Sequence, residues 1–140
     1  MQALRVTFAA AAIAAITCPA AAAYPTTLTL KLYAQNRPGE TGTVTFEQVP
    51  GGVRVVIKMA GGGNGRQPVH IHEGTCGNLN PLPKYSLGDI VHGSDTTTIS
   101  GITIGELLKG KYAIDVHFSS ADIRRYAACA DIALRNTQQS

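Results

Sequence analysis

Two histidines separated by one residue are the best candidates for chemistry in this chain of 140 residues. His70 and His72 alternate with Val69 and Ile71, and this alternation predicts a strand whose successive side chains point to opposite faces. The two imidazole rings would then share one face, about 7 Å apart along the strand. Because imidazole nitrogens bind metal ions at about 2 Å, two rings on one face can converge on a single ion.

A third histidine has a similar setting. The segment Lys111–Phe118 alternates, so that Asp115 and His117 lie on the face opposite its apolar residues. A histidine of the core would instead share a face with Val or Ile. We therefore expect the rings of His70, His72 and His117 to point outward from the wall of a β-sheet.

The donor set formed by these three residues is purely imidazole, which suits copper and zinc and has no hard-cation character. A zinc hydrolase can use three histidines and a water molecule, but it also needs a base and a substrate cleft, which the sequence does not reveal. A blue-copper site needs a cysteine ligand with His and Met close after it, and Cys129 has neither downstream. The fourth histidine, His92, is either an exposed turn residue or a ligand that folds back to the site.

The start of the chain has the pattern of a secretory signal peptide. Met1–Arg5 is short and basic, Val6–Thr17 is almost purely apolar, and Ala21–Ala23 has the small residues of a cleavage site. We expect a signal peptide at residues 1–23 and one mature domain at residues 24–140, in the periplasm or secreted. A lipoprotein anchored at Cys18 is the alternative. No later stretch is long and apolar enough to predict a membrane span.

Charge and cysteine content narrow the possibilities further. The chain has 12 Lys and Arg against 9 Asp and Glu, and these are scattered, so the composition gives no indication of nucleic acid as a partner. Removal of the leader leaves two cysteines, Cys76 and Cys129. An even pair in an exported protein predicts one disulfide, and two buried free thiols are the alternative.

Short alternating segments separated by turn residues predict an all-β fold. The clearest strands are expected at Thr26–Ala34, Thr43–Val49, Val53–Met59, Gln67–Glu73, Lys111–Phe118 and Ala127–Leu134. Weaker strands are expected at Asp89–His92 and at Thr96–Ile104, the latter with a break at Gly101. Gly77–Ser86 is expected to be irregular because it contains Pro81 and Pro83. About eight antiparallel strands without a long helix favour a Greek-key barrel or sandwich.

Several motifs resemble those of the copper/zinc superoxide dismutases, in the same order from about Val69 to Ile132. The segment Val69-His70-Ile71-His72-Glu73, followed by Cys76, is similar to the copper-ligand strand of that family. Asn80-Pro81-Leu82 and Leu87-Gly88-Asp89-Ile90 resemble two parts of its metal-site loop. The remaining similarities are those of Asp115-Val116-His117 with Ser120-Ala121-Asp122, and of Ala127-Ala128-Cys129.

The resemblance implies a fold and a set of roles. It implies a superoxide dismutase-like Greek-key barrel in which His70, His72 and His117 bind copper. It also implies that Cys76 and Cys129 form the family's intrasubunit disulfide. Asp122 would match an acidic residue that supports ligand histidines through hydrogen bonds, or else it caps the turn that follows. Asp115 shares a face with His117 and either orients a ring or is a solvated carboxylate.

The sequence also departs from the family pattern. Asn78 stands where the family has the histidine that bridges copper and zinc, and Gly77–Val91 contains no histidine at all. Asp89 alone matches a zinc ligand, so we expect no zinc site. Tyr126 stands where the family has the arginine that attracts superoxide, and Arg125 is the candidate to replace it from a shifted loop.

The sequence thus predicts an exported copper-binding protein that resembles the superoxide dismutases and dismutates superoxide at a three-histidine copper site without zinc. The alternative is a non-catalytic periplasmic protein that binds copper for delivery or tolerance. The partner is superoxide in the first case and a copper donor or acceptor protein in the second. A metal-free structural domain with relic histidines is a third possibility, and the oligomeric state stays open.

Overall fold

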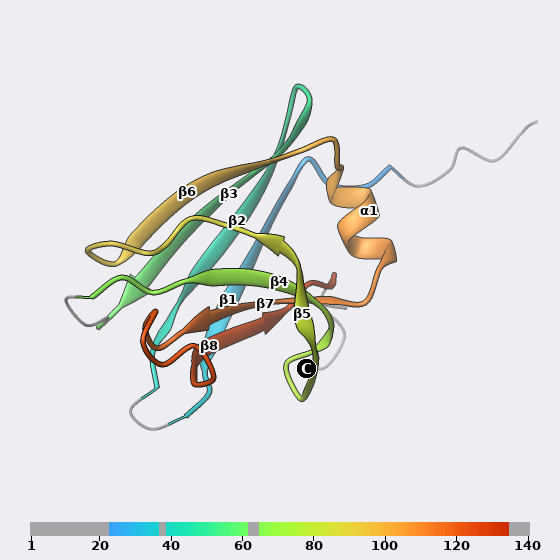
Figure 1. The fold of residues 1–140 in the computed structure, drawn as a ribbon. Helices are drawn as coiled ribbons and strands as arrows, with labels where there is room; N and C mark the ends of the chain where they lie inside the picture. The colour runs from blue at the N-terminus through green and yellow to red at the C-terminus, as the bar shows by residue number, and fades with distance from the viewer. Residues whose placement is uncertain (1–22, 37–38, 62–64, 135–140) are drawn as a thin grey trace, which may run out of the picture.

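The structure, a computed structural model, describes residues 23–36, 39–61 and 65–134. The expected signal peptide lies outside these residues, except for Ala23. Eight strands and one short helix make up the described chain (Figure 1). In order they are β1 (Thr27–Ala34), β2 (Thr41–Val49), β3 (Gly52–Ala60), β4 (Val69–Thr75), β5 (Asn78–Ser86), β6 (Ser94–Ser100), α1 (Ile104–Lys109), β7 (Tyr112–His117) and β8 (Tyr126–Asp131).

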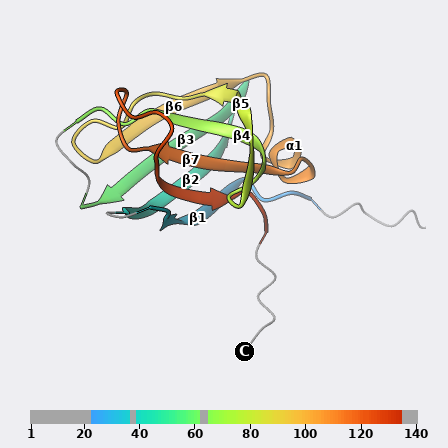
Figure 2. The same ribbon diagram turned by 60° about the horizontal axis from the view of Figure 1, so that its bottom comes forward.

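All neighbouring strands are antiparallel, and they form one sheet in the order β5-β4-β7-β8-β1-β2-β3-β6. The sheet curls into a half-barrel with β5 and β6 at its two edges (Figure 2). Its two parts meet where β1 pairs with β8, through Tyr33 with Cys129 and Ala34 with Ala128. The all-β antiparallel class predicted from the sequence is therefore confirmed.

The core lies on the concave side of this sheet and explains the alternation in the sequence. On β1, Leu28, Leu30 and Leu32 are buried while the residues between them are exposed. Strands β2, β3, β4 and β7 add their own buried apolar residues to the same cluster, including Phe46 and Ile71. Burial of such side chains contributes about 25 cal/mol per Å² of apolar surface, which makes this cluster the main source of stability.

The helix α1 connects the two parts of the sheet, and the strand that precedes it is shorter than the sequence predicted. The strand expected at 96–104 was predicted to break at Gly101, and β6 ends at Ser100 because Gly101 has a φ of +72°. The residues after this break do not continue the strand. Thr103 then caps the helix in a capping box with Glu106. The backbone N–H of Ile104 donates to the side-chain carbonyl of Gln48 at 2.9 Å, which fixes α1 against β2.

The segment that follows β4 is more regular than the sequence predicted. Residues 78–86 were expected to be irregular, but they form the edge strand β5, which pairs with β4. Pro81 and Pro83 are compatible with this position because an edge strand leaves part of its backbone without sheet partners. The pairing shifts register on both sides of His72, which gives β5 an irregular course over the outer side of β4.

Residues 89–92 were expected to form a short strand, and this prediction is wrong. They form only isolated bridges, Ile90 with Gln67 and Val91 with Ser94, and the chain turns at His92 and Gly93. The positive φ angles of these two residues, +52° and +79°, suit a tight two-residue turn into β6. In the part of the chain that the structure describes, no helix has the length and apolar character needed to cross a membrane.

Candidate metal centre

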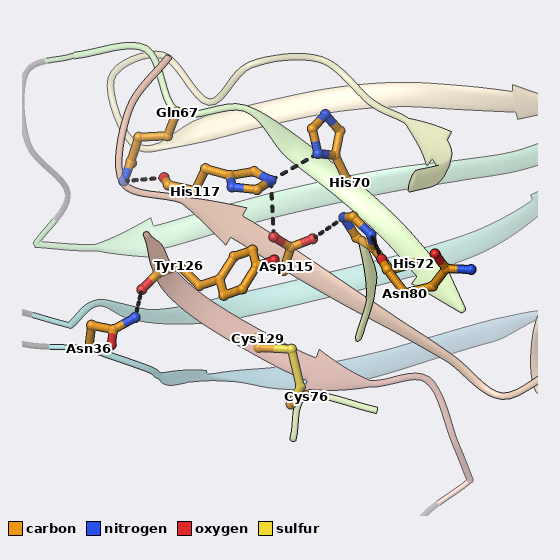
Figure 3. Close-up of polar contacts among 10 residues, drawn as sticks. All are labelled: Asn36, Gln67, His70, His72, Cys76, Asn80, Asp115, His117, Tyr126 and Cys129. Atoms are coloured by element: carbon orange, nitrogen blue, oxygen red, sulfur yellow. Dashed lines mark hydrogen bonds and ion pairs between the residues drawn. A yellow bond between two sulfur atoms is a disulfide. The ribbon is translucent and has the colours of Figure 1, made fainter. Parts of the chain in front are cut away.

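Two neighbouring strands bring four metal-binding side chains together. Strand β4 carries His70 and His72, and β7 carries Asp115 and His117 (Figure 3). The antiparallel register pairs His70 with Asp115, so all four residues lie on the face of the sheet opposite Ile71 and the core. Each offers one donor atom, and these four atoms all lie within 4.8 Å of one another.

This face is buried, although the sequence predicted that the rings would point outward. The exposed fraction is 2% for His72, 3% for His117 and 0% for Asp115, whereas His70 is half-buried. The histidine rings do lie on the face opposite the core, but they do not point into open solvent, and Asp115 is not a solvated carboxylate. The irregular edge strand β5 and the loop before Tyr126 contribute the residues that surround them.

One hydrogen bond fixes the orientation of His72. Its Nδ1 lies 2.6 Å from the backbone carbonyl oxygen of Asn80 on β5. A carbonyl oxygen can only accept, so Nδ1 of His72 carries the proton and donates. In the neutral ring, Nε2 then has a free lone pair, and this atom lies 3.2 Å from Oδ1 of Asp115.

His117 is held from several sides. Its Nε2 lies 2.8 Å from Nδ1 of His70 and 3.1 Å from Oδ2 of Asp115. Its ring packs against the ring of Tyr126, with centroids 5.1 Å apart. Its backbone carbonyl accepts a hydrogen bond of 3.3 Å from the side-chain amide of buried Gln67. These contacts direct Nε2 toward the centre of the cluster.

Burial changes the acid–base properties of the cluster. It lowers the pKa of His117 to about 4, with a further contribution from nearby His70 and partial opposition from the Ile123 backbone. Nδ1 of His117 nonetheless has no hydrogen-bond partner of good geometry. Burial, followed by repulsion from His72, also lowers the pKa of His70. His70 and His117 are therefore neutral at pH 7, which is the form that binds metal ions.

Asp115 is affected in the opposite direction. Burial raises its pKa to about 7, and its own backbone opposes this only in part. Neither carboxylate oxygen accepts a well-formed hydrogen bond, and Nε2 of His72 also has no hydrogen-bond partner. Buried polar atoms almost always have such partners. The centre of the cluster therefore contains several buried polar atoms without hydrogen-bond partners.

The distances suit a metal ion after a small contraction. Bonds of about 2.0–2.2 Å to imidazole nitrogen and carboxylate oxygen place two ligands of one ion no more than about 4.3 Å apart. The largest separation of 4.8 Å exceeds this limit by about half an ångström. Movement on that scale is within the reach of side-chain adjustment, so the four residues fit a single transition-metal ion.

A cavity of about 330 Å³ opens onto the three histidines. Its remaining lining comes from β5 and from the loop before β8, namely Pro81, Pro83, Ile123, Arg124 and Tyr126. Asp115 is not part of the lining, and it therefore lies behind the histidines as seen from the cavity. The cavity gives a small molecule a route to the three histidine side chains, of which His70 is the least buried.

A disulfide lies close to the centre, as the cysteine count predicted. Cys76 and Cys129 are bonded, with Cα atoms 5.9 Å apart. The bond joins the turn between β4 and β5 to the middle of β8, the strand that pairs with β7. The backbone N–H of Cys76 also donates to Oδ1 of Asp131 at 2.7 Å. Both contacts hold the β4–β5 turn, which leads into Asn80, against the sheet.

Other residues singled out from the sequence lie outside the cluster. His92 is exposed in the turn before β6. Asp122 contributes to a turn, in which its N–H donates to the hydroxyl oxygen of Ser119 at 3.1 Å, and it is not one of the four clustered residues. Asp89, the single match to a zinc ligand, accepts a 2.9 Å hydrogen bond from exposed Arg66.

The arginine at the cavity differs from the one expected. Arg125 lies over the ring of Phe118, 4.1 Å from its centroid, whereas the exposed Arg124 lines the cavity. The sequence contained no signal that separates these neighbours, because their direction depends on the course of the loop. Tyr126 was noted only as a replacement for arginine, yet it packs on His117 and lines the cavity.

Comparison with protein-family models, curated proteins and solved structures finds no match to this chain. The resemblance to the copper/zinc superoxide dismutases therefore stands on the motif residues alone.

Proposed function

We propose that this protein binds one copper ion through Nδ1 of His70 and Nε2 of His72 and His117. The observation that carries the proposal is the convergence of these atoms with the Asp115 carboxylate within 4.8 Å in a buried setting. Copper would supply one-electron redox chemistry at this site, and the chain would supply fixed nitrogen ligands and an access route.

The pattern of protons supports a cation at the centre. The lone pair on Nε2 of His72 faces Oδ1 of Asp115, and two electron-pair donors in contact repel each other unless a positive charge lies between them. Without one, buried acceptors cost about 1–3 kcal/mol each. A metal ion would satisfy all four residues at once, whereas one shared proton can satisfy only two.

The types of ligand favour copper among the transition metals. Imidazole nitrogen suits zinc, copper, iron and nickel, and affinity within the divalent series is highest for copper. A square-planar or tetragonal set of nitrogen and oxygen donors is typical of Cu(II) or Ni(II). Export of the protein, which we propose from the leader sequence, agrees with the Cys76–Cys129 disulfide, since such bonds persist in oxidising compartments.

Copper titration of the full chain with its disulfide intact tests this proposal. Wild-type protein should bind one copper ion, and the His70→Asn variant should bind it at least tenfold more weakly. His92→Asn is the matched control, because His92 is exposed and outside the cluster, and asparagine tolerates its positive φ. Equal loss of affinity in both variants, or no copper binding in the wild type, would contradict the proposal.

Superoxide dismutation is a second candidate function, favoured by the cavity. The histidines line an opening large enough for a diatomic anion, and exposed Arg124 on its wall would attract a negative charge. The similarity of the ligand strand to that of the superoxide dismutases agrees with this candidate. Tyr126, also in the cavity wall, would limit the space beside His117.

Rate measurements on the copper-loaded protein separate turnover from binding alone. If the protein is a dismutase, Arg124→Glu should lower the rate at low ionic strength by about tenfold and weaken its decrease with added salt, while copper affinity stays unchanged. Arg66→Glu is the control, because Arg66 is an exposed arginine paired with Asp89. A wild-type rate no higher than that of free copper would exclude this function and leave copper binding intact.

A further inference from the structure

We infer that Asp115 coordinates the copper ion directly and that its carboxylate makes the site selective for Cu(II) over Cu(I). This inference rests on the proposed copper function and deepens it, because it names the residue that determines the oxidation state that the protein holds. From the sequence alone, Asp115 was expected at most to orient a ring.

The contacts of Asp115 are those of a ligand and differ from those of an orienting residue. A carboxylate that orients a ligand histidine accepts a hydrogen bond from the ring nitrogen that does not bind the metal. For His72 that nitrogen is Nδ1, and the Asn80 carbonyl already occupies it. Asp115 instead lies 3.2 Å from Nε2 of His72 and 3.1 Å from Nε2 of His117, the nitrogens that point into the cluster.

The position of Asp115 leaves its carboxylate few possible partners besides the cluster centre. It is fully buried in the middle of β7, where it pairs in register with His70 on one side and Cys129 on the other. Both of its oxygens are buried without hydrogen-bond partners. It does not line the cavity, so solvent does not reach it from that side. A carboxylate held in this way has the cluster centre as its remaining partner.

The chemistry of the donor set then determines the preferred oxidation state. A carboxylate is a hard, negatively charged donor, and it favours a divalent ion over a monovalent one. Cu(I) prefers soft sulfur ligands, and the described cluster contains none, since Cys76 and Cys129 are bonded to each other. Three imidazoles alone would accept either ion, so Asp115 supplies the discrimination.

Competition titrations of the full chain with Cu(II) and Cu(I) test the inference. We compare wild type with Asp115→Asn, which keeps the shape of the side chain and removes its charge. The ratio of the Cu(I) to the Cu(II) dissociation constant should fall at least tenfold, which appears as a rise of about 59 mV in the one-electron potential of bound copper. Asp89→Asn is the control for loss of a nearby charge, because Asp89 acts on His70 through its charge but lies outside the cluster.

The outcomes distinguish this inference from the proposed function. If wild-type protein binds no copper, both are wrong. If copper binds in a manner that needs His70, but Asp115→Asn lowers the ratio less than tenfold or Asp89→Asn changes it as much, only the inference is wrong.

A second measurement needs no variant and decides the question even if Asp115→Asn does not fold. Aspartate labelled with ¹³C at the side-chain carboxyl carbon should give a ¹³C hyperfine coupling in the electron–nuclear double resonance spectrum of wild-type protein loaded with Cu(II). Absence of that coupling in a fully loaded sample would overturn direct coordination.

Discussion

Strands β1, β2, β3 and β6 differ from strands β4, β7 and β8 in what lies on their outer face. The first group, called here the open strands, buries its core side and exposes much of the other, as in the alternation of Leu30 with Thr29 and Lys31. The second group, the site strands, buries residues on both faces over long stretches, including all of β7 except the half-buried Tyr112.

The site strands are where this fold accepts an unfavourable arrangement. On the open strands, polar residues face water and need no special partners. On the site strands, His72, Asp115 and His117 are removed from water and meet mainly one another. Such a buried polar layer lowers the stability of the metal-free protein, and natural sequences tend to break a local rule of this kind at functional sites.

Removal of the disulfide should have the largest effect and should act on the site strands first. The double substitution of Cys76 and Cys129 by Ser opens a loop with a sequence separation of 53 residues. We expect a loss of about 4 kcal/mol in the free energy of unfolding, measured by urea denaturation. Hydrogen exchange should increase more in β4 and β5 than in β2 and β3, because the bond holds the β4–β5 turn. Equal increases in all four strands would contradict the view that the disulfide stabilises the β4–β5 region in particular.

Substitution of Asp115 should reveal the cost of the buried polar layer. In metal-free protein, Asp115→Asn should raise the free energy of unfolding by about 1–2 kcal/mol, because the new amide can donate to Nε2 of His72 and relieve an unpaired acceptor. The same change on the open strands, Glu47→Gln, is the control. Glu47 pairs with exposed Arg54, so its effect should stay below about 1 kcal/mol. A destabilised Asp115→Asn protein would contradict the view that the layer costs stability.

The open strands were predictable from the sequence because their alternation reports one buried and one solvated face. The expected strands at 26–34, 43–49 and 53–59 each lie within two residues of β1, β2 and β3. The site strands β4 and β7 were also located, and so were the three histidines on one face. Local alternation was sufficient for these results, since it depends only on neighbouring residues.

The burial of the site was not predictable, because it depends on distant parts of the chain. Alternation places Asp115 opposite the core, but it does not indicate that β5 and the loop before Tyr126 lie next to that face. The prolines of β5 suggested an irregular segment, and only the bulged pairing with β4 brings the Asn80 carbonyl to His72. The same loop geometry decides that Arg124 rather than Arg125 lines the cavity.

Removal of the N-terminal cap of α1, which lies between the two groups of strands, should have a smaller effect on the free energy of unfolding. Thr103→Ala removes the hydroxyl that accepts from the N–H of Glu106, and we expect a loss of about 1 kcal/mol in urea denaturation at pH 7. Hydrogen bonds from the Thr103 side chain and then its backbone lower the pKa of Glu106. That stabilisation is present above the ordinary glutamate pKa and is lost as the pH falls through the lowered value. The difference between variant and wild type should therefore shrink below about pH 4.5, and a constant difference would contradict the role of Glu106.

Replacement of a polar pair on the open strands should have the smallest effect on the free energy of unfolding. This pair is the control for the cluster, because it also lies on the outer face of two neighbouring strands. Thr29 and Thr45 pair directly on the outer face, with hydroxyl oxygens 3.0 Å apart, much as His70 and Asp115 pair on the site strands. Because the threonines are in water, their replacement by valine should change the free energy of unfolding by no more than about 0.5 kcal/mol. Copper affinity, measured by competition titration, should not change. A loss above about 2 kcal/mol would mean that the outer face of the open strands also depends on its polar contacts, and burial would then no longer explain why the two groups differ.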